Sequence, residues 1–241
     1  GFGAGIAVMG LSSENVYVAD NQINFSKETK GGGIFVGSSF SKGYHFVDNF
    51  ISGGATLNTN DSYGIKVNDA QNVTYCNNIL ENTHTGLSFN GNCNPSFVSQ
   101  NEMNDHVFGL KISDYSGQPG VFGEQIATLN LWLSGSYSKA ANNTSTMPTL
   151  SPYFINNDDL GDPTVNPTNI FPSSGWFLPT TSEHNLCFAP IPIVSGFDSL
   201  ILLSDISFEN LSESVKFLLE KRLIFKILSD VNLADTYSSY L

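Results

Sequence analysis

The sequence predicts an all-β solenoid of short parallel strands, continued by an irregular segment and an amphipathic α-helix. Two repeated motifs carry this prediction. The first, Gly-apolar-x-apolar, recurs five times and begins at Gly5, Gly33, Gly64, Gly86 and Gly109. The second, apolar-x-apolar-x-x-Asn-x-apolar, follows the first four copies and places its amides at Asn21, Asn49, Asn78 and Asn101. Hydrophobic residues make up 40% of the 241 residues, which excludes a disordered chain.

Both motifs alternate apolar and polar residues with a period of two, as a strand with one buried face does. Short strands of this kind cannot enclose a core alone, but stacked copies can, when each strand pairs in parallel with its equivalent in the next copy. The four Asn side chains would then form a structural ladder at a turn, because Asn tolerates left-handed backbone and its amide can hydrogen-bond along the stack. The alternative is an ordinary β-sandwich with coincidental spacing.

These repeats cover about residues 1–112 and resemble the right-handed parallel β-helix repeats of the pectin-lyase-like superfamily. The resemblance implies a right-handed parallel β-helix (solenoid), as in secreted surface proteins of Bacteroidetes-type bacteria, and an extracellular or cell-surface location. The superfamily includes polysaccharide lyases and glycoside hydrolases, so the repeat itself says little about chemistry. Because the chain opens within a repeat, we expect a fragment that lacks N-terminal coils.

The repeat is not visible in residues 113–204, which are rich in Gly, Pro, Ser and Asn. We expect an irregular segment that lies on the solenoid through the anchors Leu129, Leu131, Trp132, Tyr153, Phe154, Trp176 and Phe177. A helical C-terminal region is expected over residues 205–241, because its apolar residues recur at spacings of three and four. The helix would be amphipathic, with its apolar stripe at Leu211, Val215, Leu218, Leu219, Phe225 and Leu228.

The three cysteines are Cys76, Cys93 and Cys187, and they have no metal-ligand spacing. We expect buried free thiols, with a Cys76–Cys93 disulfide as the alternative.

The charge composition excludes several partners. Twenty-two acidic against ten basic side chains give a net charge of -12, which argues against binding to nucleic acid or to anionic lipid. No apolar run is long enough for a transmembrane segment. The only arginine is Arg222, so the repeats lack the arginine base that lyases of the superfamily use, and the acidic chain is expected to repel polyuronates.

Two groups of residues are candidates for chemistry. Carboxylates and imidazoles that can act as acid and base are expected near one corner of the solenoid, at Glu81, His84, Asp105 and His106. Asp20 and Asp48 precede ladder residues in neighbouring copies, so their stacked carboxylates could share Ca²⁺. The simpler interpretation of both groups is polar, solvated turns, with no catalytic residue, metal or cofactor.

The sequence therefore favours a non-catalytic extracellular scaffold or adhesion module that contacts glycans or other surface proteins. Tyr17, Phe35 and Tyr63 are the aromatic residues expected to stack on sugars. Long connections at residues 27–32 and 53–61 are expected to project beside the first coils as further binding surface. The alternative is a carbohydrate-active enzyme, a polysaccharide lyase or glycoside hydrolase, whose site is completed by missing N-terminal coils.

Overall fold

The computed structural model describes residues 3–9, 16–26, 30–39, 44–54, 61–133 and 138–187. The chain divides into two compact units, Gly1–Ala189 and Pro190–Leu241. The second unit lies outside the described residues, and so does the predicted amphipathic helix. Within the described residues, no helix is long and apolar enough to cross a membrane.

The described part of the chain is all-β, and its four sheets consist of parallel strands. Sheet A has the order β1(Gly3–Met9)-β4(Gly31–Ser39)-β7(Ser62–Ala70)-β10(Thr85–Asn90)-β13(Phe108–Ser113)-β16(Lys139–Asn143)-β18(Ile170–Phe171). Sheet B has the order β11(Ser96–Ser99)-β8(Val73–Cys76)-β5(Tyr44–Val47)-β2(Val16–Ala19). Sheet C has the order β15(Leu131–Trp132)-β12(Glu102–Asn104)-β9(Ile79–Glu81)-β6(Phe50–Ser52)-β3(Gln22–Asn24), and sheet D has β14(Gln125–Ile126)-β17(Tyr153–Asn156)-β19(Phe177–Thr180). Two short 3-10 turns, η1(Pro148–Leu150) and η2(Asn157–Asp159), complete the elements.

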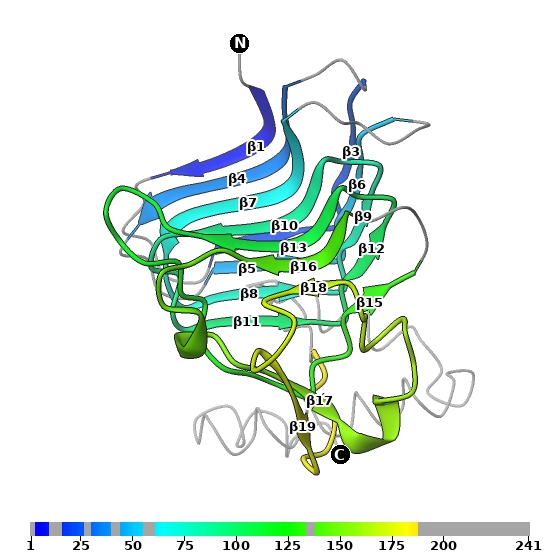
Figure 1. Ribbon diagram of the computed structural model, residues 1–241. Helices are drawn as coiled ribbons and strands as arrows, with labels where there is room; N and C mark the ends of the chain where they lie inside the picture. Colours follow the sequence, from blue (N-terminus) through cyan, green and yellow to red (C-terminus); the bar gives the residue numbers. More distant parts are fainter. Residues whose placement is uncertain are drawn as a thin grey trace, which may run out of the picture. The chain divides into compact units, whose positions relative to one another are not determined.

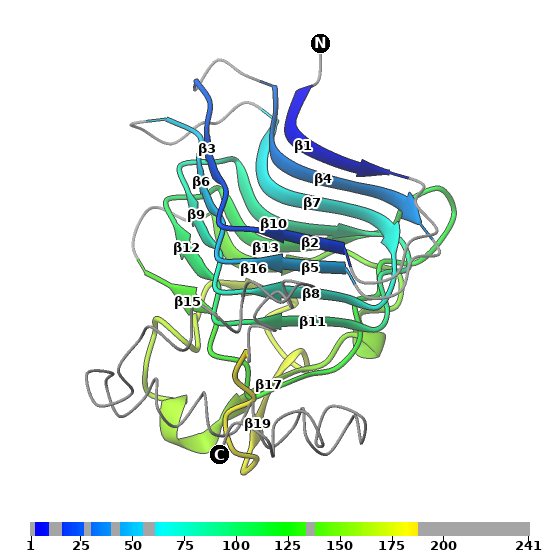
Figure 2. The same cartoon turned by 180° about the vertical axis from the view of Figure 1, so that it is seen from behind.

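The chain visits sheets A, B and C in rotation, so that three consecutive strands form one coil. Each strand pairs with its equivalent one coil later: Ile34 aligns with Ile65, and Ile65 aligns with Leu87. Sheet A faces the viewer in Figure 1, and sheet B faces the viewer in Figure 2. The predicted parallel pairing between equivalent strands is confirmed.

The core consists of columns of inward side chains, one from each coil. Ile34, Ile65 and Leu87 are buried in sheet A, and Phe46 stacks on Tyr75 from sheet B with ring centroids 5.3 Å apart. The recurrent glycines lie where backbones of successive coils approach closely: a Cβ on Gly64 would stand 2.7 Å from the carbonyl oxygen of Gly86. Glycine therefore recurs at this position because the backbone of the next coil leaves no room for a Cβ.

The sheets continue beyond residue 112, where the sequence shows no repeat. Strand β13 pairs with β16, β16 pairs with β18, and β12 pairs with β15. Residues 113–187 thus extend the stack, which the expectation of an irregular overlying segment did not foresee. Of the predicted anchors, Trp132, Tyr153 and Trp176 are buried, and the others, Leu129, Leu131, Phe154 and Phe177, are half-buried.

A side chain joins sheet B to sheet D. The amide of the buried Gln125 accepts a hydrogen bond from the backbone N–H of Val98 at 2.9 Å and donates one to the carbonyl of Ser96 at 2.7 Å. These are the bonds that a neighbouring strand would make to β11, so the Gln125 amide takes the place of a peptide group.

The prediction of buried free thiols is right for Cys93 and wrong for Cys76 and Cys187. Cys76 on β8 forms a disulfide with Cys187, 111 residues later, and Cys93 is a buried free thiol. Burial raises the pKa of the Cys93 thiol to about 12. Spacing along the sequence could not reveal the bond, because only the return of residues 181–187 to sheet B brings Cys187 to β8.

Candidate functional site

The Asn ladder lies at the turn between sheets B and C. Asn21, Asn49 and Asn78 each donate from Nδ2 to Oδ1 of the ladder Asn in the next coil, at 2.8–2.9 Å. Asn101 continues the ladder to Asn130, whose Nδ2 donates to the hydroxyl of Tyr153 at 2.8 Å. The four predicted members are joined as expected, and the sequence analysis missed a fifth, Asn130.

The conformational reason predicted for the ladder was wrong. Left-handed backbone occurs at the residue before each of the four predicted Asn residues, where φ lies between 54° and 56°: Asp20, Asp48, Asn77 and Gln100. The ladder Asn is selected by its hydrogen bonds, since Oδ1 accepts from the previous coil and Nδ2 also reaches a carbonyl, as from Asn78 to Phe46 at 2.9 Å. The preceding position accounts for the polar column that contains Asp20 and Asp48.

The proposed acid–base group is divided between the inside and the outside of the stack. His106 is fully buried, with Nε2 3.0 Å from the carbonyl oxygen of Leu80 and Nδ1 3.0 Å from the Thr83 hydroxyl. Burial lowers its pKa to about 4. Nδ1 also lies 2.9 Å from the carbonyl oxygen of Thr83, and the carbonyls of Thr83 and Leu80 raise the pKa, but burial outweighs them. His106 is therefore packed inside the stack and not presented at the surface.

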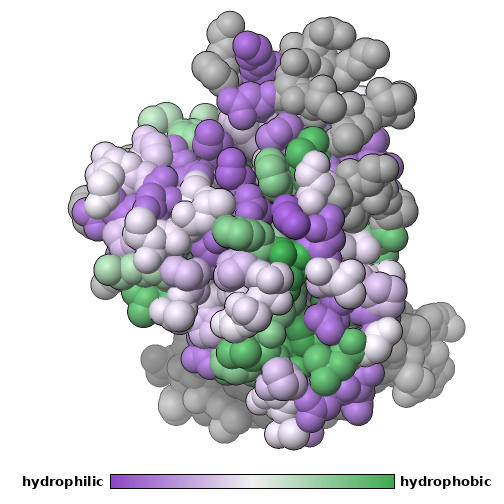
Figure 3. Space-filling view, in the orientation of Figure 1, coloured by the Kyte–Doolittle hydropathy of each residue, from purple (hydrophilic) through white to green (hydrophobic). Residues whose placement is uncertain are grey.

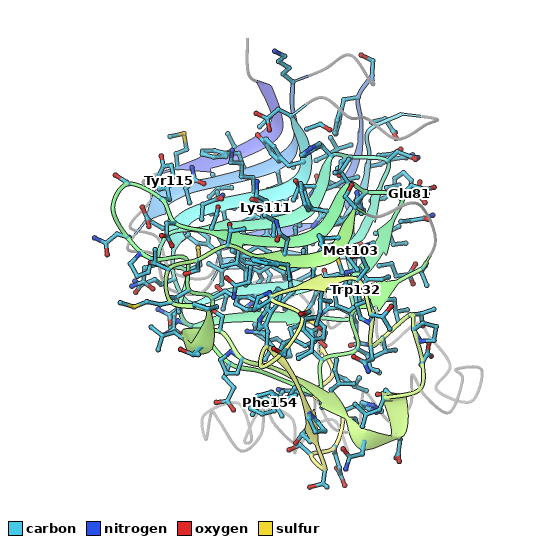
Figure 4. All side chains as sticks on the ribbon, in the orientation of Figure 1. Glu81, Met103, Lys111, Tyr115, Trp132 and Phe154 are labelled. Atoms are coloured by element: carbon cyan, nitrogen blue, oxygen red, sulfur yellow. A yellow bond between two sulfur atoms is a disulfide. The ribbon has the colours of Figure 1, made fainter. Side chains whose placement is uncertain are left out.

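The other three members of this group lie elsewhere. His84 precedes β10, where its Nδ1 lies 3.3 Å from the Thr85 hydroxyl and its ring meets Phe108 edge-on at 5.4 Å. Burial, followed by the charge of Lys111, lowers the pKa of His84, whereas Asp61 raises it. Glu81 lies on β9 of sheet C, at the edge of the view in Figure 4, and Asp105 occupies a left-handed turn with a φ of 55°.

The Asp20 and Asp48 carboxylates are neighbours on successive coils. Burial raises the pKa of Asp48, a hydrogen bond from Asn77 lowers it, and the charge of Asp20 raises it further. In the part of the chain that the structure describes, no three His, Cys, Asp or Glu side chains are grouped to hold a metal ion. The pair therefore offers Ca²⁺ two side-chain carboxylates and no third ligand of these types there.

The aromatic candidates fall on two faces. Phe35 and Tyr63 both belong to sheet A, on β4 and β7. Tyr17 lies on sheet B and stacks on His45 with ring centroids 4.6 Å apart. Burial lowers the pKa of His45, whose Nδ1 is buried without a hydrogen-bond partner among the described residues. Residues 27–29 and 55–60 of the two long loops lie outside the described part.

Two outward columns on sheet A form the most distinctive surface, which we call the lysine face. Register aligns one column as Ala7, Phe35, Lys66, Ser88, Lys111, Asn142 and Phe171. It aligns the other as Tyr63, Thr85, Phe108 and Lys139. Figure 4 shows Lys111 near the middle of this face, and Figure 3 shows hydrophilic residues over its earlier coils and more hydrophobic ones over the later coils.

Aromatic and cationic groups are paired on the lysine face. The ammonium of Lys66 lies 5.7 Å from the centre of the Tyr63 ring, and that of Lys111 lies 5.4 Å from the centre of the Phe108 ring. Sequence analysis singled out Phe35 and Tyr63 but missed Phe108 and both lysines. The signal was present as an aromatic-Gly-x-Lys unit in two copies, at Tyr63 and at Phe108.

Comparisons with protein-family models, with curated proteins and with solved structures find no match to this chain.

Proposed function

We propose that this chain is part of a right-handed parallel β-helix of the pectin-lyase-like type, which acts as a non-catalytic extracellular scaffold or adhesion module and contacts glycans through the lysine face. The observation that carries the proposal is the outward placement of Phe35, Tyr63 and Phe108 on one rigid sheet. Aromatic rings on paired strands offer apolar faces to sugar rings without any ordering of the backbone on binding.

Two further observations support this function. The disulfide Cys76–Cys187 is typical of proteins that leave the reducing cytosol. The burial of His106 takes one of the four acid–base candidates out of contact with a ligand. Phe35, Tyr63 and Phe108 also stand on strands and not on loops, which suits a surface that binds without moving.

A glycan-array measurement on the whole chain tests the proposal. We expect binding to a subset of polysaccharides, and Phe35→Ala and Tyr63→Ala should each weaken it several-fold. Tyr115→Ala is the matched control, because Tyr115 is exposed in the loop after β13, away from the lysine face. Equal binding by the wild type and the Phe35 and Tyr63 variants would contradict the assignment of this face.

A degradation assay on the same polysaccharides tests the non-catalytic part. We expect neither unsaturated products that absorb in the ultraviolet nor new reducing ends, with or without Ca²⁺. Turnover that is lost in His84→Ala or Asp48→Asn would contradict a scaffold and favour a polysaccharide lyase or glycoside hydrolase.

A further inference from the structure

Sheet C has a second distinctive outer surface, which we call the glutamate face. Register aligns its outward columns as Gln22, Phe50, Ile79, Glu102 and Leu131, and as Asn24, Ser52, Glu81 and Asn104. The charged members are the carboxylates Glu81 and Glu102, and neither column contains a lysine. Large aliphatic side chains stand beside them: Ile79 is 37% exposed, and Leu133, which follows Trp132 on β15, is 42% exposed. The glutamate face is therefore both acidic and apolar.

The lysine face on sheet A has the opposite charge. The structure describes four lysines, and three of them, Lys66, Lys111 and Lys139, belong to this face. None of the residues in its two columns is a carboxylate. Figure 1 shows sheets A and C on adjoining sides of the stack, so one molecule displays both faces at the same time. A chain with a net charge of -12 thus carries two faces of complementary charge.

The two faces are also compatible in geometry. Both consist of parallel strands that repeat at about 4.8 Å, and sheets of this kind pack face to face at about 10 Å with their strands nearly aligned. Glu81 and Glu102 lie on adjacent coils, whereas Lys66 and Lys111 lie two coils apart. The flexible stem of a lysine can span the difference of one coil step. Two copies placed side by side can therefore bring these opposite charges together.

Apolar contacts and charges would contribute differently to such an interface. An exposed ion pair contributes at most about 1 kcal/mol, so the charges alone give weak association. The rings of Phe35, Tyr63 and Phe108 supply apolar area that can pack on the aliphatic side chains of the glutamate face. The charges set the orientation, because two lysine faces or two glutamate faces would place like charges together. Screening to about 8 Å at physiological salt makes these local charges outweigh the distant net charge.

We propose that the lysine face of one copy of this chain packs on the glutamate face of a second copy. The contact is heterologous, so each copy in a pair keeps one free face that can bind a further copy. This inference goes beyond the proposed glycan-binding function. The contact covers the rings that we assign to glycans, so each copy uses its lysine face for one partner at a time.

Sedimentation velocity on the whole chain, over a series of protein concentrations, tests this contact through two charge reversals. Lys66→Glu/Lys111→Glu, the lysine variant, and Glu81→Lys/Glu102→Lys, the glutamate variant, should each associate at least tenfold more weakly than the wild type. Each reversed residue changes the charge by two, so the lysine variant moves the net charge from -12 to -16 and the glutamate variant moves it to -8. Net repulsion alone would strengthen association in the glutamate variant, so weakening in both variants identifies the two faces.

Mixing the two variants in equal amounts provides the decisive measurement. The reversed lysine face of one variant is complementary to the reversed glutamate face of the other, so the mixture should associate within about threefold of the wild type. Restored association also establishes that both variants are folded. Glu124→Lys/Asp158→Lys is the matched control, because it changes two exposed acids outside both faces and also gives a net charge of -8. It should associate at least as strongly as the wild type.

Three results would overturn the inference. One is a wild type that stays monomeric at every concentration. Another is weakening in only one of the two variants, which would mean that the two faces do not meet. The third is a mixture that associates no better than its components. None of these results affects the glycan-binding proposal, which the glycan array tests separately.

Discussion

In each internal ladder Asn, both the Nδ2 and the Oδ1 of the side-chain amide form hydrogen bonds. The Nδ2 of Asn78 donates to Asn101 Oδ1 and to the carbonyl of Phe46, while its Oδ1 accepts from the backbone N–H and the Nδ2 of Asn49. No other side chain of this length supplies both donors and acceptors at the same place. This reciprocity, and not a preference for turns, explains why Asn recurs.

Asn78→Ala should therefore destabilise the protein by about 2–5 kcal/mol, because it leaves buried partners on two other coils without hydrogen bonds. Urea unfolding measures the loss. Asn21→Ala is the comparison, since Asn21 is only partly buried and joins the ladder on one side, to Asn49. Equal losses for the two variants would contradict a cooperative ladder.

His106 should make stability depend on pH. Its folded pKa of about 4 lies below the ordinary value of 6.5, so the unfolded chain binds the proton first as the pH falls. The contribution of neutral His106 to the free energy of unfolding is complete above pH 6.5 and declines towards pH 4. The free energy of unfolding should fall by about 2 kcal/mol between about pH 7.5 and about pH 5.

Urea unfolding of wild type and of His106→Gln at both pH values isolates this contribution. The variant should have a flatter profile by about 2 kcal/mol. His45 and His84, whose pKa values burial also lowers, act in the same direction in both proteins and cancel. Parallel profiles for wild type and His106→Gln would mean that folding leaves the pKa of His106 unchanged.

At the scale of elements, the sequence predicted strands where inward residues alternate regularly. It did not predict the later coils, because β14, β15 and β18 are only two residues long and carry no alternation. One copy of the repeat can still be seen in the sequence of the later coils. Asn130-Leu131-Trp132 repeats the spacing of Asn101-Glu102-Met103, and Met103 aligns with Trp132 in the structure. The hydrogen bonds of the Gln125 side chain to β11 give no repeating pattern in the sequence, so they could not be predicted from it.

Gln125→Ala should cost about 2–5 kcal/mol, because the backbone N–H of Val98 and the carbonyl of Ser96 would remain buried without partners. Gln125→Glu should also destabilise, since a carboxylate cannot donate to the Ser96 carbonyl. Gln118→Ala, at an exposed position in the loop after β13, should be nearly neutral. Hydrogen exchange would locate the damage at β11 and β14, and unchanged protection of Val98 would contradict the bridge.

At the scale of the whole molecule, the candidate site depends on long-range register that the sequence predicted only in part. Phe35 and Tyr63 were identified as exposed aromatics. The position of Phe35 beside Lys66 follows from the pairing of β4 with β7, whereas Tyr63 and Lys66 share one strand. The acid–base hypothesis for Glu81, His84, Asp105 and His106 rested on their similar distances from the ladder Asn in two successive coils. The fold turns His106 inward, towards the Leu80 carbonyl, and leaves His84 on sheet A.

The disulfide fixes residues 181–187 along one corner of the stack. Asn185 N–H donates to the carbonyl of Ala127, the Ser99 hydroxyl donates to the carbonyl of Asn185, and Cys187 N–H donates to the side chain of Gln100. Ser99 and Ala127 are buried, so this segment is held to the stack by hydrogen bonds as well as by the covalent bond to Cys76.

Cys187→Ser should lower the free energy of unfolding by about 4 kcal/mol, because the bond closes a loop of 111 residues and restricts the unfolded chain. A reducing agent should lower the stability of the wild type by the same amount and leave that of Cys187→Ser unchanged. Cys93→Ala tests the assignment of the remaining thiol: it should keep the sensitivity to reductant, since Cys93 is free. Mass spectrometry after cleavage without reductant should recover the Cys76 and Cys187 peptides joined. Recovery of a Cys76–Cys93 pair, or insensitivity of the wild type to reductant, would contradict this connectivity and remove the disulfide's support for an extracellular location.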